Sequence, residues 1–317
     1  MARNKDITFD DAMRVVDELA REIKHHRHGL NRVQVLKAGS LGQYTAIPGN
    51  FDVDLVVYSE SVDPDTVLSE GYRTPLHKLR SFLGGLRSVM LQTPLKMSVS
   101  LKYKTYDQQD RELSIDVDVL VSPKWENPAD LYDYLRKAKQ DGAKPAQLFR
   151  FSVNASKWQV AFIEKQDDKA KELIRRAKAW RNKEWPEGKL CTGRPKSYLI
   201  SILVLRAYEL ALKQHYGGTI EQRTTATLKQ IVKSHLTADI YWVDYYKPGD
   251  YPDLFPARLP RIVDPANPAN NLHNTGIIGG STYTSHSYYE QGDGNWTQLV
   301  GKIESVDLTK TIEQIQA

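Results

Sequence analysis

Phe51-Asp-Val-Asp-Leu-Val-Val-Tyr58 is the stretch that decides the fold of this 317-residue chain. In an extended strand, Asp52 and Asp54 project from the same face. The apolar run Leu55-Val-Val57 follows at once, which indicates a largely buried strand. Two neighbouring carboxylates repel each other unless a cation neutralises them, and hard oxygen ligands suit Mg²⁺. An isolated Asp-x-Asp is more often a solvated strand edge, but the buried strand favours a metal site here.

Two other segments contain residues that could form a catalytic site together with this strand. Gly39-Ser40 lies upstream, where glycine allows a backbone to approach a phosphate and a helix start would direct N–H groups and a hydroxyl toward it. Downstream, Ser-Ile-Asp116-Val-Asp118 alternates in the same way, which puts both carboxylates on one face. We expect Asp118 to complete a two-metal site and to accept the proton of an attacking hydroxyl. Asp116 is expected to be a polar residue at a strand end, with assistance to the site as the alternative.

The hydrophobic pattern divides the chain into a sheet-rich part and a helix-rich part. The expected strands are 33–37, 51–58, 96–106 and 113–121, with a hairpin turn at 107–110. The expected helices are 8–28, 74–90, 129–139, 157–183, 197–214, 225–236 and one beginning near 296, and 273–295 is expected to be a long loop. We therefore predict an α/β (α+β) fold of two lobes with a cleft between them. Residues 1–150 would form a mixed β-sheet lobe with an N-terminal helix, and 151–317 a helical C-terminal lobe.

Composition excludes several classes of protein. The single cysteine, Cys191, excludes an internal disulfide framework and a zinc ribbon, and it fits a reducing compartment such as the cytoplasm. The most apolar helix, 198–212, is interrupted by Arg206 and Glu209, so we expect a core helix and no membrane partner. The net charge of +5 and the pI near 9.0 give weak support for a polyanionic partner. Trp158, Trp180, Trp185 and Trp242 are expected in the core.

The glycine segment and the two carboxylate segments together resemble the polymerase β-like nucleotidyltransferases. Longer segments of the chain resemble animal 2′-5′-oligoadenylate synthetases. The matching segments are Lys37-Ala-Gly-Ser-Leu-Gly42, 51–57, Asp118-Val-Leu120, 173–180, 240–246 and 261–268. This resemblance implies a nucleotidyltransferase fold and the transfer of AMP from ATP to a ribose 2′-hydroxyl. It also implies two Mg²⁺ ions, or Mn²⁺, held by Asp52, Asp54 and Asp118, and a role in innate antiviral defence.

The resemblance further implies nucleotide contacts at Gly39 and Ser40 in the first lobe and at four positions in the second. Arg175 and Lys178 would contact phosphates, and their spacing puts both on one helix face. The Tyr198 ring would stack on the donor base. The family often has glutamine before this tyrosine, whereas this chain has Ser197, as the related cyclic GMP-AMP synthases do, and this departure leaves the choice of base open.

Double-stranded RNA is the activator that the resemblance implies. Spaced basic residues would contact its phosphates and 2′-hydroxyls, and the tentative set is Arg21, Lys24, Arg27 and Lys37. Val160 and Glu164 occupy two positions where the family is basic, and Gln43 one where lysine is frequent. Activation by another ligand, a different mode of RNA binding, or no activator at all therefore stay open. We expect a monomer.

Two other functions are compatible with the sequence. A cyclic-dinucleotide synthase of the same superfamily, similar to a cyclic GMP-AMP synthase-like receptor, would use the same metal ligands. A non-catalytic RNA sensor would retain only the fold, although a protein without catalysis has no reason to keep three repelling carboxylates together.

Overall fold

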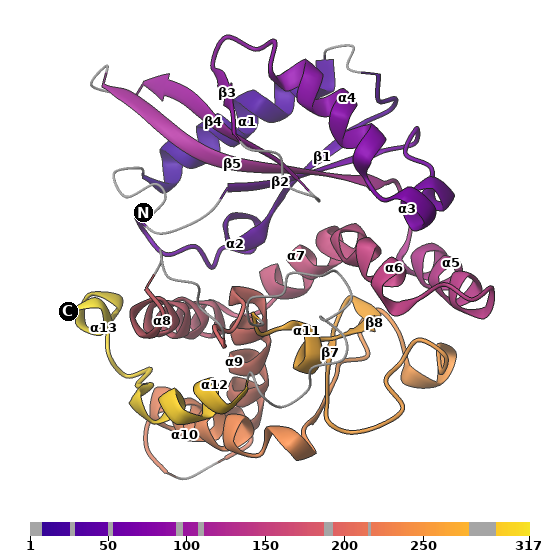
Figure 1. Cartoon of the computed structure of the whole chain (residues 1–317). Helices are drawn as coiled ribbons and strands as arrows, with labels where there is room; N and C mark the ends of the chain where they lie inside the picture. The colour runs from indigo at the N-terminus through magenta and orange to yellow at the C-terminus, as the bar shows by residue number, and fades with distance from the viewer. Residues whose placement is uncertain are drawn as a thin grey trace. The chain divides into compact units, whose positions relative to one another are not determined.

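The computed structural model describes residues 8–25, 29–49, 53–92, 98–106, 111–186, 193–214, 217–278 and 296–317 (Figure 1). Its chain packs into two compact units. The sheet unit comprises residues 2–131 and 147–164, and the helical unit comprises residues 132–146 and 165–317. The chain thus leaves the sheet unit, returns to it, and leaves it again. The division into 1–150 and 151–317 stays a prediction.

The sheet unit contains a five-stranded mixed sheet with the order β1-β2-β5-β4-β3. The strands are β1 Gln34–Ala38, β2 Val53–Ser59, β3 Val89–Leu91, β4 Ser98–Tyr106 and β5 Glu112–Pro123. Only β2 and β5 pair in parallel among these described strands, and the other pairs are antiparallel. The helices are α1 Phe9–His25, α2 Gly39–Gly42, α3 Pro64–Glu70, α4 Arg73–Leu83, α7 Ser156–Glu164 and the 3₁₀ helix Arg150–Ala155. The mixed sheet expected from the sequence is confirmed.

Alternation along β5 produces one apolar face and one polar face. Ile115, Val117 and Val119 are at most 2% exposed, whereas Asp116 and Asp118 between them are partly accessible. Burial of each aliphatic side chain of this kind stabilises the folded state by about 1.5–3 kcal/mol relative to leaving it exposed. Helix α1 packs against β1 and β2, and α4 packs against β3, β4 and β5. Packing of the apolar face therefore fixes the register of β5, and the opposite face of the strand carries Asp116 and Asp118.

Asn154 connects the returning segment 147–164 to the sheet. Its side chain accepts a hydrogen bond from Trp125 Nε1 at 2.6 Å and donates one to the Tyr72 hydroxyl at 2.7 Å. The Tyr58 hydroxyl donates to the Asn154 carbonyl at 3.4 Å. Asn154 is completely buried, so these partners satisfy polar groups that would otherwise destabilise the core.

The helical unit contains α8 Asp168–Glu184, α9 Ser197–Leu212, α10 Ile220–Lys233, α11 Leu272–Thr275, α12 Trp296–Lys302 and α13 Ile312–Gln316, and α5 Pro128–Gln140 and α6 Pro145–Phe149 lie where the chain passes between units. Its 3₁₀ helices are His235–Thr237, Pro248–Asp250 and Ile303–Ser305, and its small sheet consists of β6 Asp239–Ile240, β7 Arg261–Asp264 and β8 Asn267–Asn271. Helix α9 is buried along most of its length, as expected for a core helix. In the part of the chain that the structure describes, none of the helices has both the length and the apolar character needed to span a bilayer. The four tryptophans expected in the core are each at most 9% exposed.

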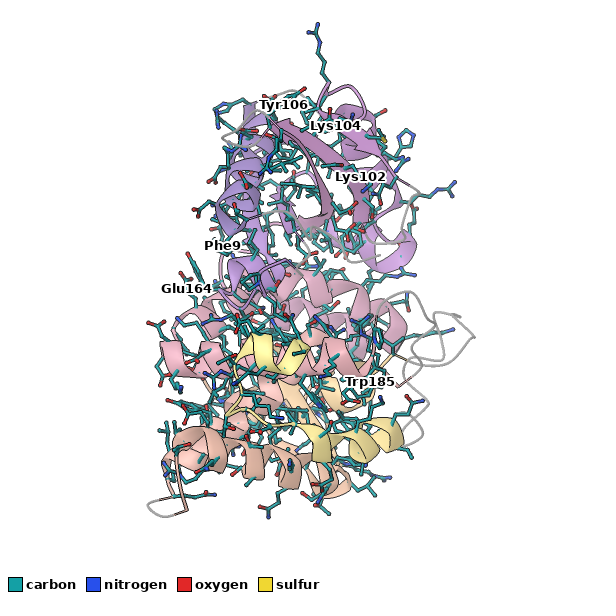
Figure 2. The ribbon with its side chains drawn as sticks, turned by 90° about the vertical axis from the view of Figure 1, so that its left-hand side faces the viewer. Phe9, Lys102, Lys104, Tyr106, Glu164 and Trp185 are labelled. Carbon is teal, nitrogen blue, oxygen red and sulfur yellow. The ribbon has the colours of Figure 1, made fainter. Side chains whose placement is uncertain are left out.

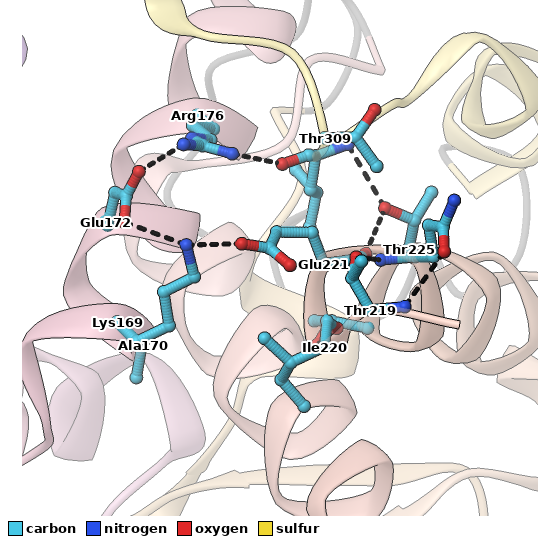
Figure 3. A network of polar contacts seen from close by, with 12 residues as sticks. Lys169, Ala170, Glu172, Arg176, Thr219, Ile220, Glu221, Thr225 and Thr309 are labelled. Carbon is cyan, nitrogen blue, oxygen red and sulfur yellow. Dashed lines mark hydrogen bonds and ion pairs between the residues drawn. The ribbon is translucent and has the colours of Figure 1, made fainter. Parts of the chain in front are cut away.

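A polar network joins α8, α10 and the C-terminal segment (Figure 3). Lys169 Nζ lies 3.1 Å from Glu172 Oε2 and 2.5 Å from Glu221 Oε1. Arg176 pairs with Glu172 and also donates to the Leu308 carbonyl at 2.6 Å. Arg176 therefore has a structural role within this unit.

Several expected elements differ from the structure in detail, and one short helix was not expected. The helix expected over 74–90 ends at Leu83, because Gly84 and Gly85 break the pattern before β3. At Gly84, an added Cβ would lie 2.8 Å from Leu91 Cδ1, so the Leu91 side chain packs closely against the backbone there. Helix α3 was missed, although Asp63 caps its start and Pro64 occupies its first turn.

The single helix expected over 157–183 is two helices, α7 and α8. The Asp167 side chain accepts from Ala170 N–H at 2.8 Å and thereby begins α8 separately. The helix expected over 225–236 starts earlier, because Thr219 and Gln222 form a capping box. Within the loop expected over 273–295, α11 covers the first residues, and 279–295 lies outside the described residues, as does the expected turn 107–110.

Candidate active site

Asp54 and Asp118 are direct neighbours across the parallel pair β2 and β5. Residues paired in register on adjacent strands project from the same face, so both carboxylates enter the same space. Both are partly accessible, while Leu55 and Val119 on the opposite face are fully buried. Asp52 lies outside the described residues. The sheet therefore brings together two of the three expected metal ligands.

Gly39 lies directly against the Asp54 carboxylate. Its φ is +58°, and a Cβ added there would lie 2.0 Å from Asp54 Oδ2. Glycine is thus required both by the left-handed backbone and by the close approach. It begins α2, and the Ser40 carbonyl accepts from Thr45 N–H at 2.9 Å. The Gly-Ser turn and a carboxylate therefore share one small region of the sheet unit.

Strand β4 borders the two carboxylates of β5 on the other side. Ser100 is the register partner of Asp118, and its hydroxyl donates to Asp118 Oδ1. Lys102 is the register partner of Asp116, and Lys102 Nζ lies 3.1 Å from Asp116 Oδ1. Gln92 Nε2 also donates to Asp116 Oδ1, at 2.6 Å. Sequence reasoning missed Ser100 and Lys102, because the sequence alone does not show which residues of β4 pair with Asp116 and Asp118 on β5.

The donor set fits Mg²⁺ in kind. Asp54 and Asp118 supply the hard oxygen donors that this ion prefers, and the glycine at position 39 allows the backbone to approach the Asp54 carboxylate closely. Across the described ranges, which omit Asp52, no cluster of three or more His, Cys, Asp or Glu residues is arranged to hold a metal. Asp54 and Asp118 thus supply donors of the kind that the expected site requires, and the site itself stays a prediction.

The helical unit contains the residues expected to contact the nucleotide. Arg175 and Lys178 lie one turn apart on α8, where Arg175 is partly accessible and Lys178 is 4% exposed. Ser197 and Tyr198 form the first turn of α9. Lys196, immediately before them, has its pKa lowered to about 8 by burial.

Tyr198 is anchored by Asp264. Its hydroxyl donates to Asp264 Oδ1 at 3.1 Å. Asp264 also accepts from Ala266 N–H at 2.9 Å and from Asn270 Nδ2 at 3.1 Å. Burial and then the Asp264 charge raise the pKa of Tyr198 well above its usual range, so the hydroxyl keeps its proton. The ring is therefore held in a fixed orientation at the start of α9.

The residues expected to contact RNA fall into different environments. Arg21 and Lys24 are exposed on α1, whereas Lys37 Nζ lies 2.9 Å from Asp17 Oδ1. Arg27 lies outside the described residues. Two of the positions that depart from the basic pattern are in the core, because Val160 is 7% and Gln43 is 6% exposed.

Glu164 is exposed at the end of α7 (Figure 2). The acidic residue Asp167, which follows it in the chain, caps α8 and accepts from the Tyr208 hydroxyl at 2.8 Å. Asp167 therefore has a structural role at the start of α8.

The matching family model and the relatives found by sequence carry the same family name. Residues 126–279 match the model of 2′-5′-oligoadenylate synthetase 1, domain 2, C-terminus. The chain is 23% identical to 2′-5′-oligoadenylate synthase-like protein 1 of Rattus norvegicus, over 76% of this chain and 49% of that protein. It is 26% identical to inactive 2′-5′-oligoadenylate synthase 1B of the rat, over 84% and 76%. Rat 2′-5′-oligoadenylate synthase 2 is 24% identical over 85% and 38%.

These relatives include a protein named as inactive beside one named as a synthase. The chain spans about half of the length of the synthase-like protein. Among solved structures, CdnC of E. coli MS115-1 with ATP superposes with a TM-score of 0.54 at 18% identity, over 93% of this chain and 81% of that chain. That likeness shows the nucleotidyltransferase fold.

Proposed function

Because the chain belongs to the 2′-5′-oligoadenylate synthetase family, we propose that it transfers AMP from ATP to the ribose 2′-hydroxyl of an acceptor adenylate and releases pyrophosphate. One observation carries this proposal. Asp54 and Asp118 are register partners on β2 and β5, and the Gly39 turn lies against Asp54. This arrangement suits a triphosphate and an attacking hydroxyl that must meet beside paired carboxylates.

In the proposed reaction, the acceptor 2′-oxygen forms a bond to the α-phosphorus while the bond from that phosphorus to the pyrophosphate oxygen breaks. Asp118 accepts the hydroxyl proton. Asp52, Asp54 and Asp118 would hold two Mg²⁺ ions, which supply charge stabilisation and a lowered pKa for the hydroxyl when bound. The backbone N–H groups and the hydroxyl of Gly39-Ser40 orient the donor phosphates.

The helical unit would supply the remaining nucleotide contacts. Arg175 and Lys178 are proposed to contact phosphates, supported by their shared face on α8. The Tyr198 ring is proposed to stack on the donor base, supported by the Asp264 hydrogen bond that fixes its hydroxyl end. Ser197 would contribute a hydroxyl beside that ring.

Double-stranded RNA is the proposed activator, in a cytoplasmic antiviral role. Arg21 and Lys24 are both exposed on α1, which supports a phosphate contact at that helix. The proposed Lys37 contact would require this lysine to exchange its Asp17 partner for a phosphate. Because Val160 and Gln43 are buried, we propose an RNA contact restricted to the α1 side of the sheet unit.

The deciding experiment incubates the purified protein with ATP and Mg²⁺, with and without double-stranded RNA, and measures pyrophosphate release. Products are then digested with nucleases specific for 2′-5′ or 3′-5′ linkages. We expect linear adenylates that only the 2′-5′-specific nuclease cleaves, and no pyrophosphate from Asp118→Asn. Wild-type protein that releases no pyrophosphate under either condition would instead be a non-catalytic member of the family.

One observation favours a second candidate, a cyclic-dinucleotide synthase. Ser197 precedes Tyr198 at the start of α9, as in cyclic GMP-AMP synthases. Incubation with all four nucleoside triphosphates followed by phosphatase treatment separates the two candidates. A phosphatase-resistant cyclic product would replace the oligoadenylate proposal.

A further inference from the structure

The two carboxylates of β5 lie on one face of the sheet but have different partners. Asp116 and Asp118 are two residues apart, so both point to the side where Asp54 also projects. A divalent cation could draw on either of them. Their neighbours on β4 distinguish them, because Lys102 pairs with Asp116 and Ser100 pairs with Asp118.

Asp116 accepts hydrogen bonds from the side chains of Lys102 and Gln92. Lys102 Nζ lies 3.1 Å from Asp116 Oδ1 and 3.3 Å from Oδ2, so the ammonium group contacts both oxygens. Gln92 Nε2 donates to Oδ1 at 2.6 Å. The Asp116 side chain is 17% exposed, which limits competition from water. A carboxylate whose oxygens already interact with a cation and an amide is a poor ligand for a second cation.

Gln92 is itself held in place from two directions. Its N–H donates to the Ser100 carbonyl at 2.9 Å, and its carbonyl accepts from Arg80 Nη2 at 3.0 Å. Gln92, whose side-chain amide donates to Asp116, is therefore hydrogen-bonded through its backbone to Ser100, the residue of β4 that contacts Asp118. The two carboxylates are linked through β4 and the end of β3.

On β4, the register partner of Asp118 is the neutral residue Ser100. The Ser100 hydroxyl donates to Asp118 Oδ1, and Ser100 is 5% exposed. A hydroxyl adds no charge, so it orients the carboxylate without offsetting its attraction for a cation. Hydrogen bonds of this kind to a ligating carboxylate fix its orientation toward a metal.

We propose that Ser100, Lys102 and Gln92 sort the two β5 carboxylates, with Ser100 positioning Asp118 as a metal ligand while Lys102 and Gln92 withhold Asp116 from the metal. This inference rests on the proposed function, since it concerns the same metal site. Ser100 is a positioning residue, and Lys102 determines which carboxylate binds.

The test measures Mn²⁺ binding by electron paramagnetic resonance in the presence of a non-hydrolysable ATP analogue. Ser100→Ala should raise the Mn²⁺ dissociation constant about tenfold, the usual effect of removing such a partner. Ser100→Thr keeps the hydroxyl and should bind as the wild type does. Asp118→Asn should lose binding at least as strongly as Ser100→Ala, while Asp116→Asn should stay within about threefold of the wild type.

Lys102→Met should change the affinity for Mn²⁺ in the opposite direction. Without the ammonium group, the Asp116 charge is added to the site, and Mn²⁺ should bind about threefold more tightly. The gain should disappear in Lys102→Met combined with Asp116→Asn. Lys104 is the matched control, because it lies on β4 two residues further on and pairs with Glu112 at 2.9 Å (Figure 2). Lys104→Met should leave Mn²⁺ binding unchanged.

Three results would overturn the inference. These are unaltered binding in Ser100→Ala, equal losses in Asp116→Asn and Asp118→Asn, or weaker binding in Lys102→Met. Failure of the proposed function is separate, since it would appear in the wild-type protein as an absence of both Mn²⁺ binding and pyrophosphate release.

Discussion

Replacement of Gly39 by alanine tests the contact on which the proposed function depends. An alanine at φ +58° adopts the left-handed region, which costs roughly 1–2 kcal/mol for a residue with a Cβ. The added Cβ would also lie 2.0 Å from Asp54 Oδ2, although real Cβ contacts essentially never fall below 3.0 Å. The carboxylate oxygen or the turn must therefore move by about 1 Å.

A displacement of that size has a known kinetic consequence. Misplacing a catalytic group by about 1 Å can reduce the rate about a hundredfold. We therefore expect Gly39→Ala to lower the initial rate of pyrophosphate release from ATP about a hundredfold, beyond its loss of stability. The assay is pyrophosphate release at saturating Mg²⁺, on protein whose folding is verified by urea unfolding.

Gly142→Ala is the matched control. Its φ is +91°, so an alanine is strained there too, but an added Cβ would meet nothing within 4 Å. Gly142→Ala should lose a similar 1–2 kcal/mol of stability and keep its rate within about threefold. Equal rates in Gly39→Ala and Gly142→Ala would refute the reasoning, because backbone strain alone would then explain both variants.

Three further predictions concern stability. Tyr44 has φ +56° and is 48% exposed, so Tyr44→Gly should raise the free energy of unfolding in urea by about 1 kcal/mol; a decrease would show that the ring stabilises the fold. Lys196 has a folded pKa of about 8, below its ordinary 10.5, so the unfolded chain binds more protons between these pH values and stability should rise with pH there. Urea unfolding of wild type and Lys196→Met should show that rise only in the wild type. Glu221 has its pKa lowered to about 2, chiefly by Lys169, so its contribution is present above pH 4.5 and declines as the pH falls toward 2. Glu221→Gln should remove this part of the acid sensitivity in pH-dependent urea unfolding, and an unchanged profile would contradict the assignment.

The sequence predicts those parts of the fold that depend on local periodicity. The alternation around Asp54 and Asp118 indicates two strands with one polar face, and the structure pairs these strands side by side. Helix α1 follows from its 3.6-residue spacing of apolar residues. These patterns are visible because each face of an element contacts one kind of environment.

The wrong boundaries arise where a short local interaction overrides a continuing pattern. Apolar residues continue past Leu83, but Gly84 and Gly85 end the helix. Periodicity also continues between α7 and α8, where the Asp167 cap starts a new helix. A cap or a glycine pair acts over three or four residues, whereas periodicity is averaged over a longer window.

The partners of the carboxylates were beyond the reach of the sequence for another reason. Ser100 and Lys102 contact Asp118 and Asp116 because of the register between β4 and β5. A shift of one residue would turn both side chains to the opposite face. Register depends on the packing of the whole sheet, so the sequence can suggest which carboxylates are present but not which neighbours each one has.

The path of the chain between the two units restricts how this protein could be shortened or recombined. Residues 147–164 return to the sheet unit after 132–146 have joined the helical unit. A single cut near residue 150 would separate Asn154 from Trp125 and Tyr72, leaving buried polar groups without their partners. Neither unit can therefore be transferred to another protein as one uninterrupted segment, and a crossover at a single point within 132–164 would divide both. For this chain, inheritance as a whole is the simplest route by which both units stay intact.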